Sequence, residues 1–153
     1  MGYVCASPAQ QAPTEVLAVC CSDHRIQAGV REFLDGNLNL RANYDSLVVP
    51  GGPQCLVEFE PLPKFGWAGR KWSRTLIQLH SLKRVILIAH HDCGWYRWLV
   101  DYRSSRGSVR HWQEEDLRAA KRAVSRLDPE LAVDLFYAAW GTDDVMTIET
   151  VPS

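Results

Sequence analysis

A regular alternation of short apolar runs with amphipathic segments is the feature that most constrains how this chain folds. The runs "EVLAVC", "YDSLVV" and "RVILIA" have the length and composition of buried strands, at residues 15–20, 44–49 and 84–89. Two more apolar runs, at residues 132–140 and 145–151, surround the turn "GTDD". Because strands that alternate with helices are typical of an α/β domain, we predict a mostly parallel central sheet flanked by helices.

Apolar residues at spacings of three and four predict three helices between these strands. The recurring residues are Ile26, Val30, Phe33 and Leu34 in the first helix, Trp72, Leu76, Leu79 and Leu82 in the second, and Leu117, Ala120, Val124 and Leu127 in the third. The run "PGGP" at residues 50–53 ends the second strand, and the proline-punctuated segment 57–66 is expected to be a loop.

Length, charge and cysteine content narrow the class of protein. The 153 residues, 46% of them hydrophobic, suffice for one domain, which we place at residues 15–153 after a flexible arm at residues 1–14. The formal net charge of −1 gives no polybasic face, and no apolar run approaches the roughly 20 residues of a membrane helix, so we expect neither a nucleic-acid nor a membrane partner. The arm lacks the basic and apolar regions of a secretory signal, which predicts a cytoplasmic protein with reduced cysteines.

Polar clusters follow the first and the third predicted strand. The cluster "CSDHR" occupies residues 21–25, and the cluster "HHDC" occupies residues 90–93. Ligands bind beyond the carboxyl ends of parallel strands, and neighbouring strands lie about 4.8 Å apart. The two clusters are therefore expected to share one ligand.

Three residues of these clusters match the donor set of a catalytic zinc site. Zinc is bound by Cys thiolates, His nitrogens and carboxylates, and catalytic sites keep one of the four positions open. Cys21 can supply one ligand from the first strand end, while His90 and Cys93 can converge from a tight loop. Asp23 and Arg25 follow Cys21 at alternating positions and could pair with each other, which would orient a ligand in the fourth position.

Both clusters, together with the strands before them, resemble the motifs of one enzyme family. The segment "VLAVCCSDHRI" closely resembles the C-x-D-x-R signature of the β-class carbonic anhydrases, and "VILIAHHDCGW" resembles that family's H-x-x-C-G segment after an apolar strand. The resemblance covers most of residues 15–151. It implies a β-carbonic-anhydrase-like fold with zinc as the cofactor.

The resemblance also implies a role for each matched residue. Cys21, His90 and Cys93 would bind the zinc ion, and Asp23 and Arg25 would form the Asp–Arg dyad beside it. In that family, zinc-bound hydroxide attacks carbon dioxide and yields bicarbonate, and the active-site cleft is built partly from a neighbouring subunit. The expected function is therefore that of a carbonate dehydratase, a zinc lyase, in a homodimer or a larger homo-oligomer.

Departures from the family pattern keep other functions open. The central loop reads "PGGP" at residues 50–53, where the family reads Arg-Asn-Ala-Gly, and few residues precede Cys21. Trp95 and Trp98 make the surroundings aromatic, and the aromatic segment 65–72 is a candidate contact surface for a second subunit. An altered pocket suits a zinc hydrolase of carbonyl sulfide or carbon disulfide, whereas a partly lost pocket suits a zinc-binding protein without catalysis.

Each candidate residue also has a plainer structural interpretation. A cysteine such as Cys21 is often a small buried apolar residue, and Asp23 could cap the helix that follows it. Arg25 could be a solvated helix residue. His24 and His91 are candidate proton carriers by residue type and position alone.

Overall fold

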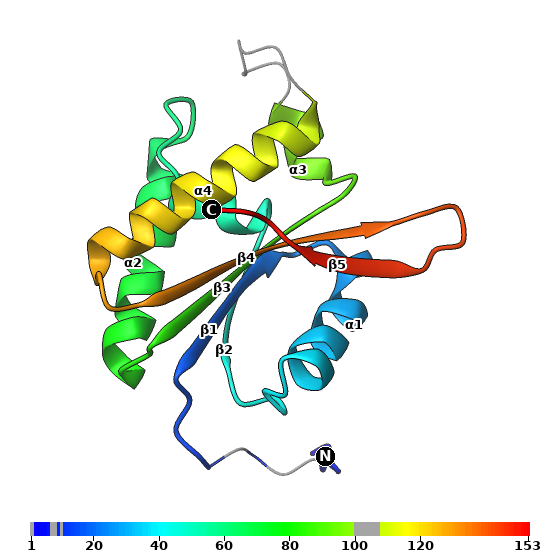
Figure 1. Cartoon of the computed structure of the whole chain (residues 1–153). Helices are drawn as coiled ribbons and strands as arrows, with labels where there is room; N and C mark the ends of the chain where they lie inside the picture. The colour runs from blue at the N-terminus through cyan, green and yellow to red at the C-terminus, as the bar shows by residue number, and fades with distance from the viewer. Residues whose placement is uncertain (1, 7–8, 10, 100–107) are drawn as a thin grey trace.

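A five-stranded sheet in the order β2-β1-β3-β4-β5 forms the centre of the protein (Figure 1). The computed structural model describes residues 2–6, 9, 11–99 and 108–153. The first four strands are parallel and β5 is antiparallel to β4, which confirms the predicted mostly parallel sheet. The strands are β1 (Val16–Cys21), β2 (Asp45–Val49), β3 (Arg84–His90), β4 (Ala132–Trp140) and β5 (Met146–Thr150).

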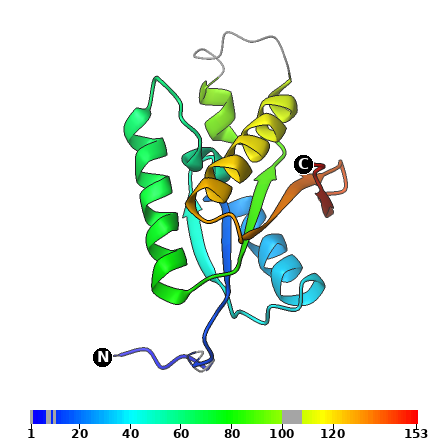
Figure 2. The ribbon, with the colours of Figure 1, turned by 60° about the vertical axis from the view of Figure 1, so that its left-hand side comes forward.

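Helices cover both faces of this sheet. The long helices α2 (Pro63–His80) and α4 (Val109–Leu127) pack on one face, and α1 (His24–Glu32) packs on the other (Figure 2). A π-helical turn (Phe33–Asn37) extends α1, and the short helix α3 (Gly94–Leu99) follows β3. Within the described residues, no helix combines the length and the apolar character needed to cross a lipid bilayer.

Strand β1 shows how the sequence produces two core layers. All six of its residues are buried. Leu17 and Val19 belong to the core that packs against α2 and α4, whereas Ala18 and Cys20 belong to the core beneath α1. Successive side chains of a strand point to opposite faces, so a continuous apolar run in a central strand contributes to both layers.

Two expectations about loops need correction. The segment 57–66 is irregular only as far as Leu62, because α2 begins at Pro63. A proline is tolerated in the first turn of a helix, where its missing N–H has no partner to lose, so the prolines here precede a helix. Helix α3 was not predicted, since its six residues are too few to show a helical period.

The "PGGP" run ends β2 and continues into a 3₁₀-helix (Gly52–Leu56) that packs on the end of β1. Gly51 and Gly52 have φ angles of 73° and 53°, a conformation that favours glycine. Space also requires glycine, because a Cβ atom on Gly52 would lie 2.7 Å from the backbone nitrogen of Cys21. The loop therefore brings its backbone directly against the last residue of β1.

Candidate metal centre

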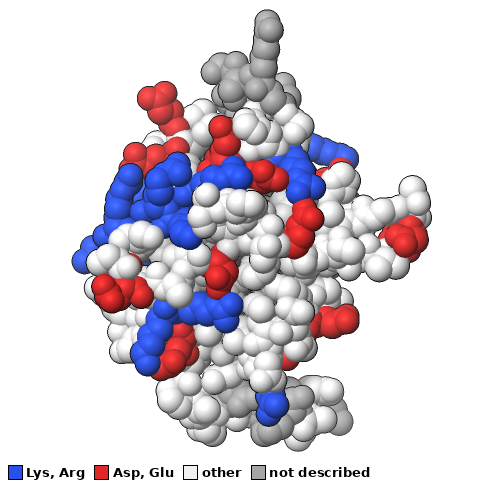
Figure 3. Space-filling view, viewed as in Figure 1, with Lys and Arg blue, Asp and Glu red and all other residues white. Residues whose placement is uncertain are grey.

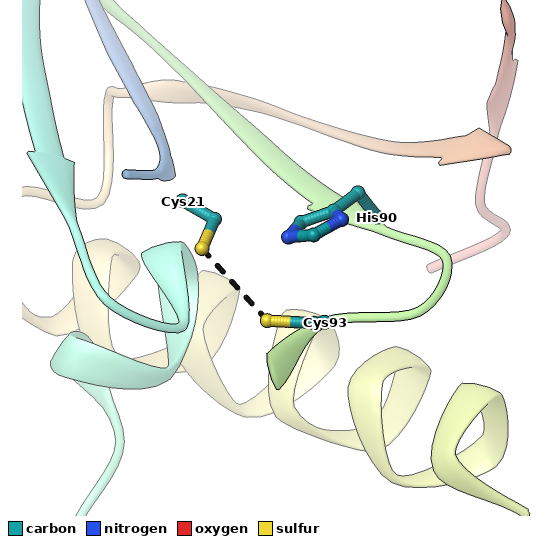
Figure 4. A group of neighbouring side chains, drawn as sticks. All are labelled: Cys21, His90 and Cys93. Atoms are coloured by element: carbon teal, nitrogen blue, oxygen red, sulfur yellow. Dashed lines mark hydrogen bonds between the residues drawn. The ribbon is translucent and has the colours of Figure 1, made fainter. Parts of the chain in front are cut away.

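Three side chains from the two polar clusters meet at the carboxyl edge of the sheet. Cys21 is the last residue of β1 and His90 is the last residue of β3, and these strands are neighbours. Cys93 follows the turn after β3. The three side chains point into one space (Figure 4), and their ligand atoms lie within 4.8 Å of one another. All three residues are buried, so the fold gathers donors that could hold a metal ion.

The distance between the two sulfur atoms fits a tetrahedral zinc ion. The Sγ atoms of Cys21 and Cys93 lie 3.8 Å apart. Two thiolates bound to zinc at about 2.3 Å, with a tetrahedral angle between them, also lie about 3.8 Å apart. The sulfur atoms therefore need no rearrangement to bind zinc together.

His90 presents an unpartnered nitrogen to the same space. Its Nδ1 lies 2.7 Å from the carbonyl oxygen of His91, and since a carbonyl only accepts, Nδ1 carries the ring proton. Its Nε2 is buried and has no hydrogen-bond partner among the described residues. Ligating histidines are held in this way through their second nitrogen, and a metal ion at Nε2 would satisfy a buried atom that otherwise costs free energy.

The two thiols of the group differ from the other buried cysteines. The hydrogen bond with Cys93 lowers the pKa of Cys21 to about 4, and the same contact raises the pKa of Cys93. The contact thus favours a thiolate on Cys21, and a dication would favour a second thiolate on Cys93. Burial raises the pKa of Cys20 and of Cys55 to about 12, so these two stay neutral thiols in the core.

Buried hydrogen bonds hold the loop that carries His90 and Cys93. Gln113 of α4 donates from Nε2 to the His90 carbonyl oxygen at 2.8 Å, and Tyr137 of β4 donates to Gln113 Oε1 at 3.0 Å. Asp92 adopts a φ of 57°, which turns the chain between the two donors. Gln113 and Tyr137 were not predicted from the sequence; a glutamine at helical spacing before the apolar stripe of the third helix was the available signal.

Asp23 and Arg25 form a bidentate ion pair beside the group. Arg25 donates from Nε to Oδ1 at 3.0 Å and from Nη2 to Oδ2 at 2.7 Å. The carboxylate also accepts from the backbone nitrogen of Arg25 at 3.0 Å and caps α1, so Asp23 caps the helix and pairs with Arg25 at the same time. Hydrogen bonds from Arg25 hold the pKa of Asp23 well below its usual range, and the same contact raises the pKa of Arg25.

Asp92 is a second partner of Arg25. Arg25 donates from Nη1 to Asp92 Oδ2 and from Nη2 to the Asp92 carbonyl oxygen, both at 3.0 Å. Asp92 also pairs with Arg97 of α3. Arg25 therefore links the start of α1 to the turn that carries two of the three donors. This contact was not predicted from the sequence, because the H-x-x-C-G segment specifies no residue type at the position of Asp92.

An open cavity of about 710 Å³ reaches Cys21 from the surface. Its other lining residues are Ser22, Asp23, His24, Arg25, Pro50, Gly94, Trp95 and Trp98. Trp95 packs so closely on Gly51 that a Cβ atom there would lie 2.2 Å from its Cδ1, and Trp95 Nε1 donates to Gln54 Oε1 at 3.3 Å. Pro50, Trp95 and Trp98 therefore form an apolar part of the cavity wall, whereas Asp23 and Arg25 form a charged part.

The two candidate proton carriers lie outside the donor group. His24 lines the cavity, and its side chain is 94% exposed. His91 is exposed and contacts the ring of Trp140 edge-on, and it is not part of the described cavity lining. Of the two, only His24 has access both to the cavity and to solvent in the described structure.

Comparison with solved structures identifies the fold. The carbonic anhydrase from Streptococcus mutans has a TM-score of 0.59 at 14% identity, over 97% of this chain and 88% of that one. The β-carbonic anhydrase from Trichomonas vaginalis has a TM-score of 0.56 at 11% identity, over 95% and 86%. The tetrameric β-carbonic anhydrases from Sordaria macrospora have a TM-score of 0.55 at 13% identity, over 92% and 82%.

Comparison of the amino-acid sequence with other proteins finds low similarity. No protein-family model matches the chain. An uncharacterised protein from Rickettsia bellii is 25% identical over 122 residues, which is 78% of this chain and 73% of that protein. Another from Rickettsia conorii is 26% identical over 87 residues, 55% of this chain and 44% of that protein. The chain therefore has the fold of the β-carbonic anhydrase structures and carries a Cys–His–Cys group that could bind a metal ion.

Proposed function

We propose that the protein is a zinc-dependent carbonic anhydrase of the β class, which converts carbon dioxide reversibly to bicarbonate. The observation that carries the proposal is the buried donor group of Cys21, His90 and Cys93, with sulfur atoms 3.8 Å apart and an unpartnered His90 Nε2. The ion pair of Asp23 and Arg25 lines the same cavity as Cys21, and the fold supports the same activity.

The residues around the donor group have distinct roles in this proposal. Cys21, His90 and Cys93 would hold a zinc ion, which would supply a nucleophile by lowering the pKa of water to about 7. Asp23 stays ionised beside Arg25, so its carboxylate can accept a hydrogen bond and orient the nucleophile. Trp95 and Trp98 give the cavity apolar surface for a small neutral substrate, and the exposed His24 can pass a proton to solvent.

The composition of the cavity favours one alternative function, hydrolysis of carbonyl sulfide or carbon disulfide. Among the described residues that line the cavity, Arg25 is the one arginine or lysine, and it already bonds to Asp23 and Asp92. Pro50 and Trp95 offer no further cation to an anionic product. Such a wall suits apolar linear substrates. A protein that binds zinc without either activity is the remaining alternative.

We further propose that copies of the chain associate through exposed aromatic side chains. Trp67, Trp72 and Trp98 are 63%, 46% and 51% exposed, and the first two lie in the segment 65–72. Aromatic residues are enriched at interfaces, and the Sordaria macrospora enzymes are tetramers. Sedimentation at micromolar concentration should show a dimer or a larger assembly, and a monomer would contradict this proposal.

Metal analysis with two activity assays separates the functions. The purified protein should hold about one zinc per chain and hydrate carbon dioxide in a stopped-flow assay. Asp23→Ala should keep its zinc, because three donors remain, and lose roughly 10–100-fold of the activity. The control Glu32→Ala changes an exposed acid of α1 outside the cavity lining and should retain both. Sulfide release without hydration would support the hydrolase, and absence of zinc or of both activities would reject a catalytic role.

A further inference from the structure

Helices α2 and α4 concentrate positive charge on one side of the molecule. α2 carries four Lys or Arg residues and no acid, and α4 carries five Lys or Arg residues and three acids. The whole chain has 17 basic and 18 acidic residues, so these two helices hold more than half of the basic ones. Figure 3 shows basic side chains gathered over the C-terminal half of α4. The net charge of the whole chain is therefore near zero although the surface over α2 and α4 is basic.

A groove of about 390 Å³ lies within this surface. Arg70 of α2 and Arg122 and Arg126 of α4 line it. Ala119 and Ala123 form part of the same lining, and their short side chains leave room beside the arginines. Three guanidinium groups thus border one groove. The groove has no lining residue in common with the candidate metal centre.

The two arginines of α4 lack the carboxylate partners that several other arginines have. Arg25, Arg84 and Arg110 each donate hydrogen bonds to a carboxylate. Within the described part of the chain, neither Arg122 nor Arg126 has an ion pair or a side-chain hydrogen bond. They are one helical turn apart, where like charges repel each other. An anion held between them would remove this repulsion.

Ordinary structural causes account for part of the arrangement. Cations stabilise the last turn of a helix, which explains Arg126, and Arg70 donates to the Leu56 carbonyl oxygen at 3.3 Å, but neither cause explains Arg122, one turn before Arg126. Glu58 also lines the groove and pairs with Arg70 at 3.4 Å. The Glu58 side chain is 89% exposed, and such surface pairs contribute little, so an incoming anion can displace it.

We propose that this groove binds a small anion with two linked phosphoryl groups. The planar guanidinium group binds phosphate oxygens through paired hydrogen bonds, and three of them carry more donors than one phosphoryl group can use. The volume of the groove lies in the range of small-molecule sites, whereas an extended polyanion needs no such hollow. The inference stands independently of the zinc chemistry, since it uses other residues.

Inorganic pyrophosphate is the probe, titrated by calorimetry into the full zinc-loaded chain at fixed ionic strength. The wild-type protein should bind one equivalent per chain. The variant Arg122→Gln/Arg126→Gln should bind about a hundredfold more weakly, because each charge-assisted hydrogen bond accounts for roughly tenfold in affinity. The matched control Arg31→Gln/Arg74→Gln removes two exposed arginines outside the groove and should bind like the wild type.

Glu58→Gln provides a test in the opposite direction. It removes the carboxylate that competes for Arg70, so affinity should rise by up to about fivefold. Zinc content, measured after each titration, should stay constant, which separates binding in the groove from extraction of the metal. Absence of saturable binding, an equal loss in both double variants, or heat that follows zinc release would each overturn the proposal.

Discussion

The two ends of the parallel sheet carry the same kinds of side chain in different states. At the amino ends of the strands, His80 pairs with Asp45 and Lys83 pairs with Glu15. The Lys83 and Glu15 side chains are 71% and 59% exposed, and the His80 side chain is 41% exposed beside a less exposed Asp45. At the carboxyl ends, His90 keeps a buried nitrogen without a described partner beside two buried thiols.

This difference separates a site from a collection of polar residues. Surface charges that pair with each other leave little for a ligand to stabilise, and such pairs contribute at most about 1 kcal/mol. Buried donors without partners cost free energy, which a bound ion recovers. Residue type alone therefore does not identify a site, whereas a buried nitrogen without a described partner that lies beside two buried thiols indicates one.

Cys93→Ser should have the largest effect, because it removes one of three donors at the carboxyl end. Zinc content should fall from about one per chain to near zero after dialysis, and hydration activity should fall with it. His80→Ala, at the other end, should leave zinc content unchanged and alter the free energy of unfolding by less than about 1 kcal/mol. Full zinc retention in Cys93→Ser would show that zinc binding does not need Cys93 and would contradict the proposed metal site.

Asp92→Asn should weaken activity without releasing zinc. The substitution removes the charge that holds Arg25 from the second side, while asparagine tolerates the left-handed backbone at this position. We expect hydration activity to fall by up to roughly tenfold. Asp144→Asn is a matched control, because Asp144 has the same φ of 57° in an exposed turn. Unchanged activity in Asp92→Asn would mean that Asp23 alone positions Arg25.

Gln113→Leu should remove a hydrogen bond that holds the loop carrying His90 and Cys93. It removes the hydrogen bond to the His90 carbonyl oxygen and leaves the buried Tyr137 hydroxyl without its acceptor. Zinc affinity, measured by competition with a chelator, should fall by roughly tenfold or less, and the free energy of unfolding by about 1–3 kcal/mol. Tyr137→Phe keeps the bond to His90 and should therefore preserve zinc affinity. Equal affinity in both variants would limit Gln113 to a role in stability.

The elements that local patterns specify were predicted best. Residues 15–20 were expected as a strand, and β1 is Val16–Cys21, because a buried central strand needs a continuous apolar run. The donor group followed from the rule that parallel strands end at one edge. Sequence patterns therefore suffice for strands and for the side chains directly after them.

The supporting contacts could not be predicted, because they join distant parts of the chain. Arg25 and Asp92 are 67 positions apart, and Gln113 lies 23 positions after His90. Each contact depends on how helices pack on the sheet and on one turn with a positive φ. Neither the packing of the helices on the sheet nor the positive φ of the turn can be predicted from residue spacing in the sequence.

The smallest expected effect concerns the stability that the ion pair of Asp23 and Arg25 provides near neutral pH and loses in acid. Hydrogen bonds from Arg25 hold the folded-state pKa of Asp23 below the value of about 3.9 expected in an unfolded chain. Because the folded pKa is the lower one, the stabilisation is fully present above about pH 4 and is lost as the pH falls toward the folded pKa. Asp23→Asn preserves the helix cap and removes only the charge.

Zinc-free samples of both proteins separate this effect from acid release of the metal, and because Cys21, with its pKa of about 4, is present in both, the measured quantity is the difference between the two proteins. At pH 7 the free energy of unfolding should be lower in Asp23→Asn by about 1 kcal/mol, a small value because the Arg25 side chain is 40% exposed and water screens the pair. Urea unfolding should show this difference shrinking as the pH falls from about 4 toward 2. Because asparagine keeps the helix cap, a difference that stays constant over this range would show that ionisation of Asp23 does not stabilise the fold. The ion pair would then act by orienting Asp23 rather than by stabilising the protein.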